Sequence, residues 1–111
     1  MLEQNRQLAC ASGIDAVMQE FQLDALVVPT IGPPWMIDLI DGDHKMGGSS
    51  QPAALAGYPA IMVPAGYTFG LPAGVTFMGR AFSEPKLIQL ADAFEQATRF
   101  RRAPRFVPTT P

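Results

Sequence analysis

One stretch of the chain holds the residue types of a serine hydrolase within a few positions of one another. Asp43 and His44 precede Ser49 and Ser50, and an acid, a base and a hydroxyl nucleophile are the parts of a catalytic triad. Two adjacent side chains line up with a nearby serine when the loop bends sharply, and the sequence does not predict such a bend. A solvent-facing loop histidine is the favoured interpretation of His44, and we expect no catalytic residue in the chain.

Lysine is the other base that can activate a serine, and neither lysine is placed for that role. Lys45 is flanked by flexible residues, and Lys86 falls in the exposed first turn of an expected helix. A lysine acts as a base when a dry environment lowers its pKa. The sequence predicts that environment at neither position.

Metal ligands are scarce in the sequence. A single histidine, His44, and a single cysteine, Cys10, are too few for the usual zinc site. Asp38, Asp41 and Asp43 alternate in a glycine-containing loop, but the twelve-residue spacing and the final glutamate of a calcium-binding loop are missing. We expect neither a metal ion nor a cofactor.

Length and composition limit the remaining classes. The chain has 111 residues, of which 16% are charged, and a net charge of -2. This length allows one modest core, so we expect a single domain over residues 1–111. The charged share is below the usual ~25%, which indicates that much of the surface is either buried or covered by a partner.

Charge and apolar runs exclude two kinds of partner. A net negative chain is not typical of a protein that binds nucleic acid. No apolar run approaches the ~18 residues that a membrane span requires. With one cysteine and therefore no disulfide within the chain, we expect a cytoplasmic protein that binds neither nucleic acid nor a membrane.

Two elements are expected in the first third of the chain. Apolar residues recur at helical spacing and predict a helix over residues 3–22 with one buried face; they are Ile14, Val17, Met18 and Phe21. Gly13 weakens the middle of this helix by roughly 1 kcal/mol relative to alanine. The apolar run of residues 25–28 predicts a strand that is buried on both faces.

The rest of the chain alternates loops with short elements. Residues 30–50 are expected to form a loop that packs over a surface through its apolar members, Trp35 among them. A short helix over residues 52–56 should end at Gly57. Strand-like runs follow at residues 61–63 and 75–78, and the glycines between them, Gly66 and Gly70, predict a loose hairpin or a pair of neighbouring strands.

The last expected element is a helix over residues 83–102. Ser83 is placed to cap it, and arginines at its end would offset the helix dipole. Its apolar face is formed by Leu87, Leu90, Ala91 and Phe94. The proline-rich tail after residue 103 is expected to be extended.

Several short segments of the sequence resemble those of a known family. Residues 57–66 read Gly-Tyr-Pro-Ala-Ile-Met-Val-Pro-Ala-Gly, residues 70–74 read Gly-Leu-Pro-Ala-Gly, and Gly-Arg follows at residues 79–80. Before them, residues 23–30 read Leu-Asp-Ala-Leu-Val-Val-Pro-Thr. In order and spacing they resemble the C-terminal region of amidase-signature enzymes, in particular the branch of peptide amidases and related bacterial amidases.

The resemblance implies an α/β fold, in which a small mixed β-sheet flanked by helices forms a partial amidase-signature fold. Enzymes of this family hydrolyse carbon–nitrogen amide bonds with a serine nucleophile, a second serine on a cis peptide and a buried lysine. These residues belong to the first half of a much longer enzyme. The chain is therefore expected to be a C-terminal fragment that is inactive alone.

One segment resembles the start of the family's serine-rich signature. It is Gly47-Gly48-Ser49-Ser50, but Gln51 and Pro52 follow where the family has glycines. Those glycines let backbone amides converge on the oxyanion. A turn that caps the short helix is the favoured interpretation.

The resemblance also suggests a site and partners. The loop would border the substrate pocket of the complete enzyme, with Trp35, Asp43 and His44 in its lining, although Trp35 also fits a packing anchor for the loop. The expected partner is the missing N-terminal amidase portion or a second copy in a homo-oligomer. Two alternatives stay open: a binding or structural module derived from an amidase, and a small hydrolase that uses Ser49 or Ser50.

Overall fold

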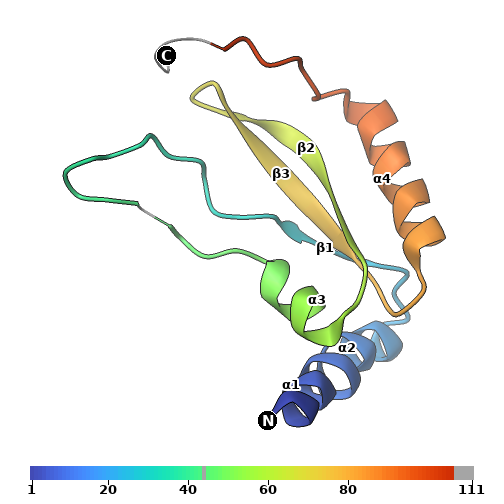
Figure 1. The fold of residues 1–111 in the computed structure, drawn as a ribbon. Coiled ribbons are helices and arrows are strands. Elements are labelled where there is room, and N and C mark those ends of the chain that lie inside the picture. The colour runs from blue at the N-terminus through green and yellow to red at the C-terminus, as the bar shows by residue number, and fades with distance from the viewer. Residues whose placement is uncertain (44, 107–111) are drawn as a thin grey trace.

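The computed structural model describes residues 1–43 and 45–106, and it shows one sheet with helices on both faces (Figure 1). Strands β1 (Leu26–Pro29), β2 (Ala60–Thr68) and β3 (Leu71–Met78) lie in the order β1-β3-β2. The helices are α1 (Leu2–Ala9), α2 (Asp15–Glu20), α3 (Ser50–Ala56) and α4 (Glu84–Thr98). The expected α/β fold, a small sheet flanked by helices, is confirmed.

Both strand pairings are antiparallel, so the sheet itself is not mixed. β2 and β3 are joined by Phe69 and Gly70, whose φ values of 50° and 78° suit a tight hairpin turn. A two-residue connection joins antiparallel strands, because parallel neighbours need a long crossover. The hairpin is longer than the two predicted runs, and it places β3 in the centre of the sheet.

The sheet carries a separate apolar cluster on each face, because successive side chains of a strand point to opposite sides. Phe77 faces α4 and packs in a cluster with Val63, Leu87 and Ala91. The next residue, Met78, belongs to the cluster on the other face, whose further members are Ile14, Met18, Ala53 and Ala56. Of the predicted face of α4, Leu87 and Ala91 are buried, whereas Leu90 and Phe94 are half-buried.

The predicted N-terminal helix is interrupted in the middle by a π-helical turn, Cys10–Ile14. Gly13 lies in this turn, where an added Cβ would come within 2.8 Å of the Leu8 carbonyl oxygen. Its lack of a side chain therefore allows the close approach. The predicted apolar face is only half correct, since Ile14 and Met18 are buried while Val17 and Phe21 remain exposed.

Strand β1 lies at the edge of the sheet and is not buried on both faces. It pairs with β3 alone, with Val27 opposite Phe77. Helix α4 contacts β2 and β3 (Figure 1), and Val27 stays 55% exposed. The prediction of a doubly buried strand is wrong for this chain, because an apolar run does not determine which element covers it.

Helix α4 starts where the sequence predicts but is not capped by a serine side chain. Ser83 occupies the N-cap position, but its hydroxyl donates to the Arg80 carbonyl at 2.7 Å. Glu84 and Pro85 fill the first turn as expected. The serine therefore stabilises the turn before the helix.

The end of α4 differs from the prediction of a helix that runs to residue 102. Arg99 adopts a left-handed conformation with φ 49° and terminates the helix. The chain then returns to the hairpin, where the Tyr67 hydroxyl donates to the Phe100 carbonyl at 3.1 Å. The Arg102 guanidinium lies 4.6 Å from the centre of the Tyr67 ring. These contacts hold the tail against β2.

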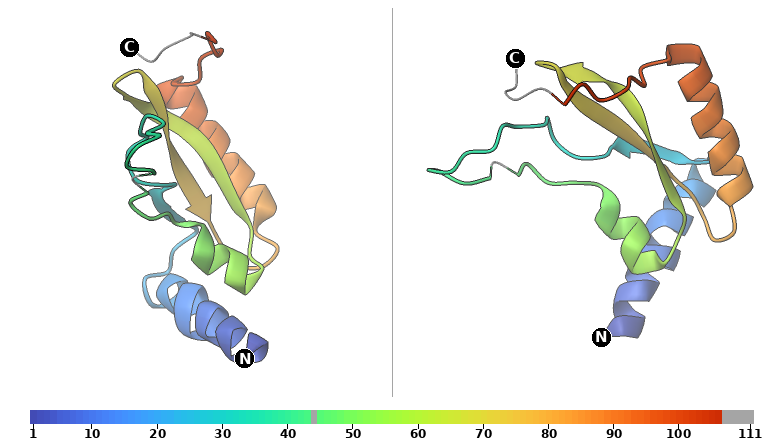
Figure 2. Two further views of the ribbon diagram at one scale, coloured as in Figure 1. Left: turned by 60° about the vertical axis from the view of Figure 1, so that its left-hand side comes forward. Right: turned by 45° about the horizontal axis from the view of Figure 1, so that its top comes forward.

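Residues 30–49 project from the sheet as a long loop, which we call the arm (Figure 2). Ile31 and Gly48 pair at its base. Helix α3 follows and ends at Gly57 with a left-handed φ of 70°, as expected. The radius of gyration is 16.4 Å, against about 13 Å for a compact chain of this length, so the molecule is open. Within the described residues, no helix has the length and apolar character to cross a membrane.

Candidate functional site

A pocket of ≈ 390 Å³ opens on the sheet face opposite α4, between α3 and the strands. Its walls combine hydroxyl groups with small or apolar side chains. The hydroxyl-bearing residues are Thr30, Ser49, Ser50, Tyr58 and Thr76. The other lining residues are Ala53, Ala54, Ala60 and Met62. We refer to this cavity as the hydroxyl pocket.

Two threonines in the hydroxyl pocket bind each other. The Oγ1 atoms of Thr30 and Thr76 lie 2.8 Å apart, and Thr76 is only 6% exposed. A buried hydroxyl needs a partner, and each threonine supplies one to the other. The backbone N–H of Thr30 also donates to the Gly74 carbonyl at 3.0 Å. Together these bonds extend the attachment of β1 to β3 by one residue.

Ser49 ties the end of the arm to its beginning at Thr30. Its hydroxyl donates to the Thr30 carbonyl at 3.2 Å, and its backbone N–H donates to the same oxygen at 3.1 Å. Ser49 occupies the N-cap position of α3 but makes no side-chain cap hydrogen bond. The expected capping turn is therefore correct in position, while the hydroxyl is used to fasten the arm.

Tyr58 connects the hydroxyl pocket to the N-terminal helices. Its hydroxyl donates to the Asp15 Oδ2 atom at 2.6 Å. This hydrogen bond raises the pKa of the Tyr58 phenol well above its usual range, and a hydrogen bond with Cys10 and burial act in the same direction. The raised pKa keeps the Tyr58 phenol protonated, as the donor of this hydrogen bond.

The described lining of the hydroxyl pocket places no base beside its two serines. Its described lining contains no lysine, histidine, aspartate or glutamate, and a serine nucleophile needs an adjacent base. Lys45 and Lys86 are exposed and lie outside this lining. The hydroxyl groups of this lining can both donate and accept hydrogen bonds.

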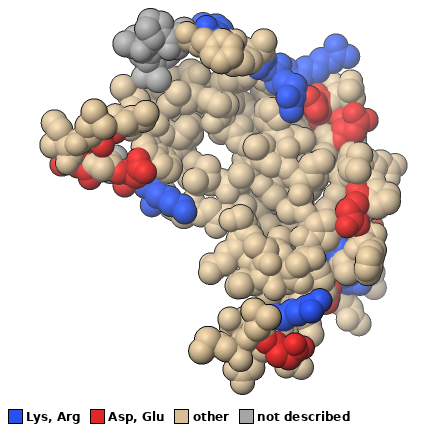
Figure 3. Space-filling model, in the orientation of Figure 1, with Lys and Arg blue, Asp and Glu red and all other residues tan. Residues whose placement is uncertain are grey.

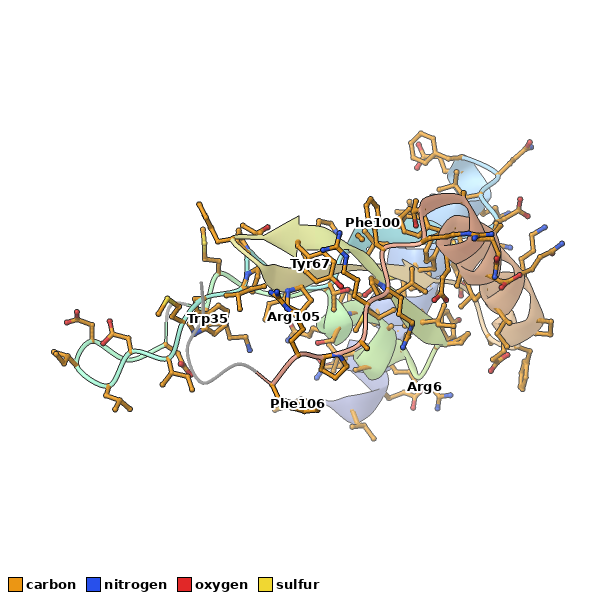
Figure 4. All side chains as sticks on the ribbon, turned by 90° about the horizontal axis from the view of Figure 1, so that it is seen from above. Arg6, Trp35, Tyr67, Phe100, Arg105 and Phe106 are labelled. Carbon is orange, nitrogen blue, oxygen red and sulfur yellow. The ribbon has the colours of Figure 1, made fainter. Side chains whose placement is uncertain are left out.

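The predicted site residues lie on the arm rather than in the hydroxyl pocket. The Trp35 indole N–H donates to the Asp43 Oδ1 atom at 3.2 Å, so the structure does bring these two together. Figure 4 shows Trp35 on the arm, far from α4. Neither residue lines the hydroxyl pocket, and His44 falls outside the described residues. Their role in binding a substrate stays a prediction.

The aspartates of the arm shape the loop. The Asp38 Oδ1 atom accepts from the backbone N–H groups of Ile40 and Asp41 at 2.9 and 3.0 Å, which is the geometry of a side-chain turn. Figure 3 shows acidic side chains on the projecting part of the molecule, and others along its right-hand side and at its lower end. In the part of the chain that the structure describes, no group of three or more ligating side chains could hold a metal ion.

Three members of the hydroxyl pocket are not among the site residues predicted from the sequence: Thr30, Tyr58 and Thr76. A signal for one of them was present, because Thr76 is the single polar residue in the run of residues 75–78. A polar residue inside an apolar strand must find a partner. Nothing near Thr76 in the sequence identifies this partner, because it is Thr30, 46 positions earlier in the chain.

Comparison with known proteins identifies the family. A family model described as Amidase matches residues 1–88, which is most of the chain. The chain belongs to the amidase family. A probable amidase of Arabidopsis thaliana is 45% identical to it over 97 residues, covering 86% of this chain and 16% of that protein. The A subunit of glutamyl-tRNA(Gln) amidotransferase from Rubrobacter xylanophilus is 58% identical over 55 residues, covering 48% and 11%.

A solved structure matches nearly the whole length of this chain. The native peptide amidase from Stenotrophomonas maltophilia matches with a TM-score of 0.83 and 51% identity. The match covers 95% of this chain and 21% of that enzyme. The amidase chain thus spans about a tenth to a fifth of the length of these relatives, and its fold is a partial amidase-signature fold.

Proposed function

We propose that this amidase chain is the C-terminal portion of a carbon–nitrogen amide hydrolase and that it hydrolyses no amide alone. The observation that carries the proposal is the match of 95% of the chain to 21% of a peptide amidase. The hydroxyl pocket supports it, because its described lining holds hydrogen-bonding groups without a base. In this proposal the Ser-cisSer-Lys residues lie in the remaining amidase portion. The cytoplasm is the proposed location.

The contribution of the chain to catalysis is to build one wall of the amide-binding pocket. Thr30, Ser49 and Thr76 fix the arm to the sheet through the hydrogen bonds described above. The arm then carries Trp35 and Asp43, linked at 3.2 Å, toward a substrate held by the rest of the enzyme. His44 belongs to the same proposed wall on sequence grounds.

Reconstitution tests this function. A peptide amidase chain that lacks the portion aligned with this one is purified and mixed with this chain, and hydrolysis of a peptide amide is measured. We expect no turnover from either part and turnover from the mixture. Steady turnover by this chain alone that disappears in Ser49→Ala or Ser50→Ala would contradict the proposal and favour the small hydrolase.

The same mixture tests the arm. Trp35→Ala and Asp43→Ala are expected to raise KM several-fold and to change kcat little, since they remove binding contacts rather than reacting groups. Ile37→Ala is the matched control, because Ile37 lies on the same arm and is 85% exposed. Equal KM values in all three variants would remove the arm from the substrate pocket and leave the rest of the proposal standing.

The alternative is a self-associating binding or structural module derived from an amidase. The open shape and the uncovered edge of β1 favour it. Reconstitution that fails with well-folded partners, together with a stable complex of this chain with itself, would favour this module over the amidase portion.

A further inference from the structure

The two legs of the arm meet at one residue, Thr30. The outgoing leg starts there, directly after β1. The return leg bonds back to the Thr30 carbonyl, which accepts from the Ser49 backbone N–H at 3.1 Å and from the Ser49 hydroxyl at 3.2 Å. The Thr30 N–H donates to the Gly74 carbonyl of β3, the central strand, at 3.0 Å. Thr30 therefore joins both legs of the arm to the middle of the sheet.

The Thr30 hydroxyl adds a link that backbone pairing alone does not supply. Its Oγ1 atom lies 2.8 Å from that of Thr76, whose side chain is 6% exposed. Gly74 leaves room for this hydroxyl, because an added Cβ would come within 3.2 Å of Thr30 Oγ1 and 2.9 Å of Met62 Sδ. The end of an edge strand opens easily when few contacts hold it. The threonine pair therefore fixes the start of the arm.

The stretch between Thr30 and Trp35 is restrained along its length. Its two prolines, residues 33–34, have fixed φ angles and favour an extended chain. Gly32 is the flexible residue of the stretch, but the return leg passes close beside it, and an added Cβ would lie 2.8 Å from the Met46 Cβ atom. The position of Thr30 is therefore transmitted to Trp35.

Trp35 is also held by the return leg. Its indole N–H donates to the Asp43 Oδ1 atom at 3.2 Å, and its side chain is half-buried although the arm projects from the sheet (Figure 2). A lid moves on hinge residues that absorb changes in φ and ψ. The two ends of this arm, Thr30 and Ser49, are instead hydrogen-bonded to each other. The arm thus has the contacts of a fixed element.

We propose that Thr30 is a positioning residue: its hydroxyl, bound to that of Thr76, sets the direction of the arm and so places Trp35 and Asp43 before a substrate arrives. The arm is then a fixed wall and not a lid. A preset wall saves the entropy cost of ordering a loop on binding, so loss of the hydroxyl weakens substrate binding and leaves the reacting groups unchanged. The effect on the reaction rests on the proposed function, whereas the effect on the arm does not.

The single tryptophan of the chain reports the arm directly. Thr30→Val keeps the shape of the side chain and removes the hydroxyl. We expect a lower fluorescence anisotropy of Trp35 and stronger quenching by acrylamide, because nanosecond loop motion is then allowed. Thr30→Ser keeps the hydroxyl and should retain the wild-type values. Thr98→Val is the matched control, because it removes a threonine hydroxyl that donates at 2.8 Å on α4, and it should leave Trp35 unchanged.

Gly74→Ala gives an independent reading, because it removes no hydrogen-bonding group. The added methyl group would lie 3.2 Å from Thr30 Oγ1, so the pair with Thr76 must shift, and Trp35 should loosen as in Thr30→Val. Circular dichroism and urea unfolding of each variant distinguish a loosened arm from an unfolded chain. A Trp35 that is already mobile in the wild-type chain, or one that is equally restrained in Thr30→Val, would overturn the proposal. An equal change in Thr98→Val would do the same.

The reconstituted mixture tests the effect on the reaction. Thr30→Val is expected to raise KM several-fold and to change kcat little, and Thr30→Ser to keep both values. An unchanged KM in a Thr30→Val mixture that turns over would overturn the role of Thr30 in the reaction. A wild-type mixture without turnover contradicts the proposed function instead, and the fluorescence of Trp35 then decides on its own whether Thr30 positions the arm. The two proposals therefore fail separately.

Discussion

The sheet face under α4 and the opposite face bury similar numbers of side chains but differ in how completely they are closed. Under α4, Phe77 and Phe94 meet edge to face with ring centres 5.9 Å apart, and Leu87 is only 1% exposed. On the other face, Leu8 is 66% exposed and Leu55 47% beside the ≈ 680 Å³ groove. The part of the sheet under α4 is closed by this chain, whereas the opposite face is partly open.

The difference follows from how each covering element is attached. Helix α4 begins shortly after β3 ends, so the chain itself holds the helix against the hairpin. The N-terminal helices reach the sheet through β1, an edge strand, and through Tyr58, whose hydroxyl meets Asp15. The open face therefore adds a polar contact, Tyr58 with Asp15, to its apolar cluster.

The largest loss of unfolding free energy is expected from a cavity under α4. Leu87→Ala removes a fully buried side chain and should lower the free energy of unfolding by about 2–5 kcal/mol. Ile88→Ala, one residue further on and 58% exposed, should change it by about 0.5 kcal/mol or less. Urea unfolding followed by circular dichroism measures both. Equal losses would mean that the Leu87 side chain is no better buried than that of Ile88.

A smaller loss of unfolding free energy, which depends on pH, is expected from a substitution at Tyr58. Tyr58→Phe removes the hydrogen bond to Asp15 and should lower the unfolding free energy by about 1–2 kcal/mol at neutral pH. The Asp15 hydrogen bond raises the pKa of Tyr58 in the folded state, so above about pH 10 the unfolded chain releases a proton that the folded chain keeps. Stability should therefore fall with rising pH above 10, and less steeply in Tyr58→Phe. Parallel pH profiles would contradict this.

The same contrast explains which features could be predicted from the sequence. The hairpin, the start of α4 and the glycine that ends α3 depend on residues close together in the chain, such as Gly57 and Gly70. Those expectations are confirmed. The exposure of Val27 depends on which strand becomes the edge, and the end of α4 at Arg99 accompanies contacts of the following residues with Tyr67. Local patterns do not contain that information.

The candidate site shows the same limit. The link between Trp35 and Asp43 spans eight residues within one loop, and both were singled out from the sequence. The hydroxyl pocket joins Thr30, which follows β1, with residues of α3, β2 and β3. Thr30 and Thr76 are 46 positions apart in the sequence. Only the folded chain brings these hydroxyl groups together.

The smallest loss of unfolding free energy is expected at the pair Thr30 and Thr76, which lies on the open face of the sheet. Thr76→Val keeps the shape of a side chain that is 6% exposed but removes its hydroxyl, leaving Thr30 without a partner 2.8 Å away. A net loss of about 1 kcal/mol is expected for one such hydrogen bond. Because Thr30 and Thr76 act on each other, the double variant Thr30→Val with Thr76→Val should cost less than the two single losses added together. Additive losses in urea unfolding would show that the hydroxyl groups are satisfied elsewhere and that the pair does not hold β1 to β3.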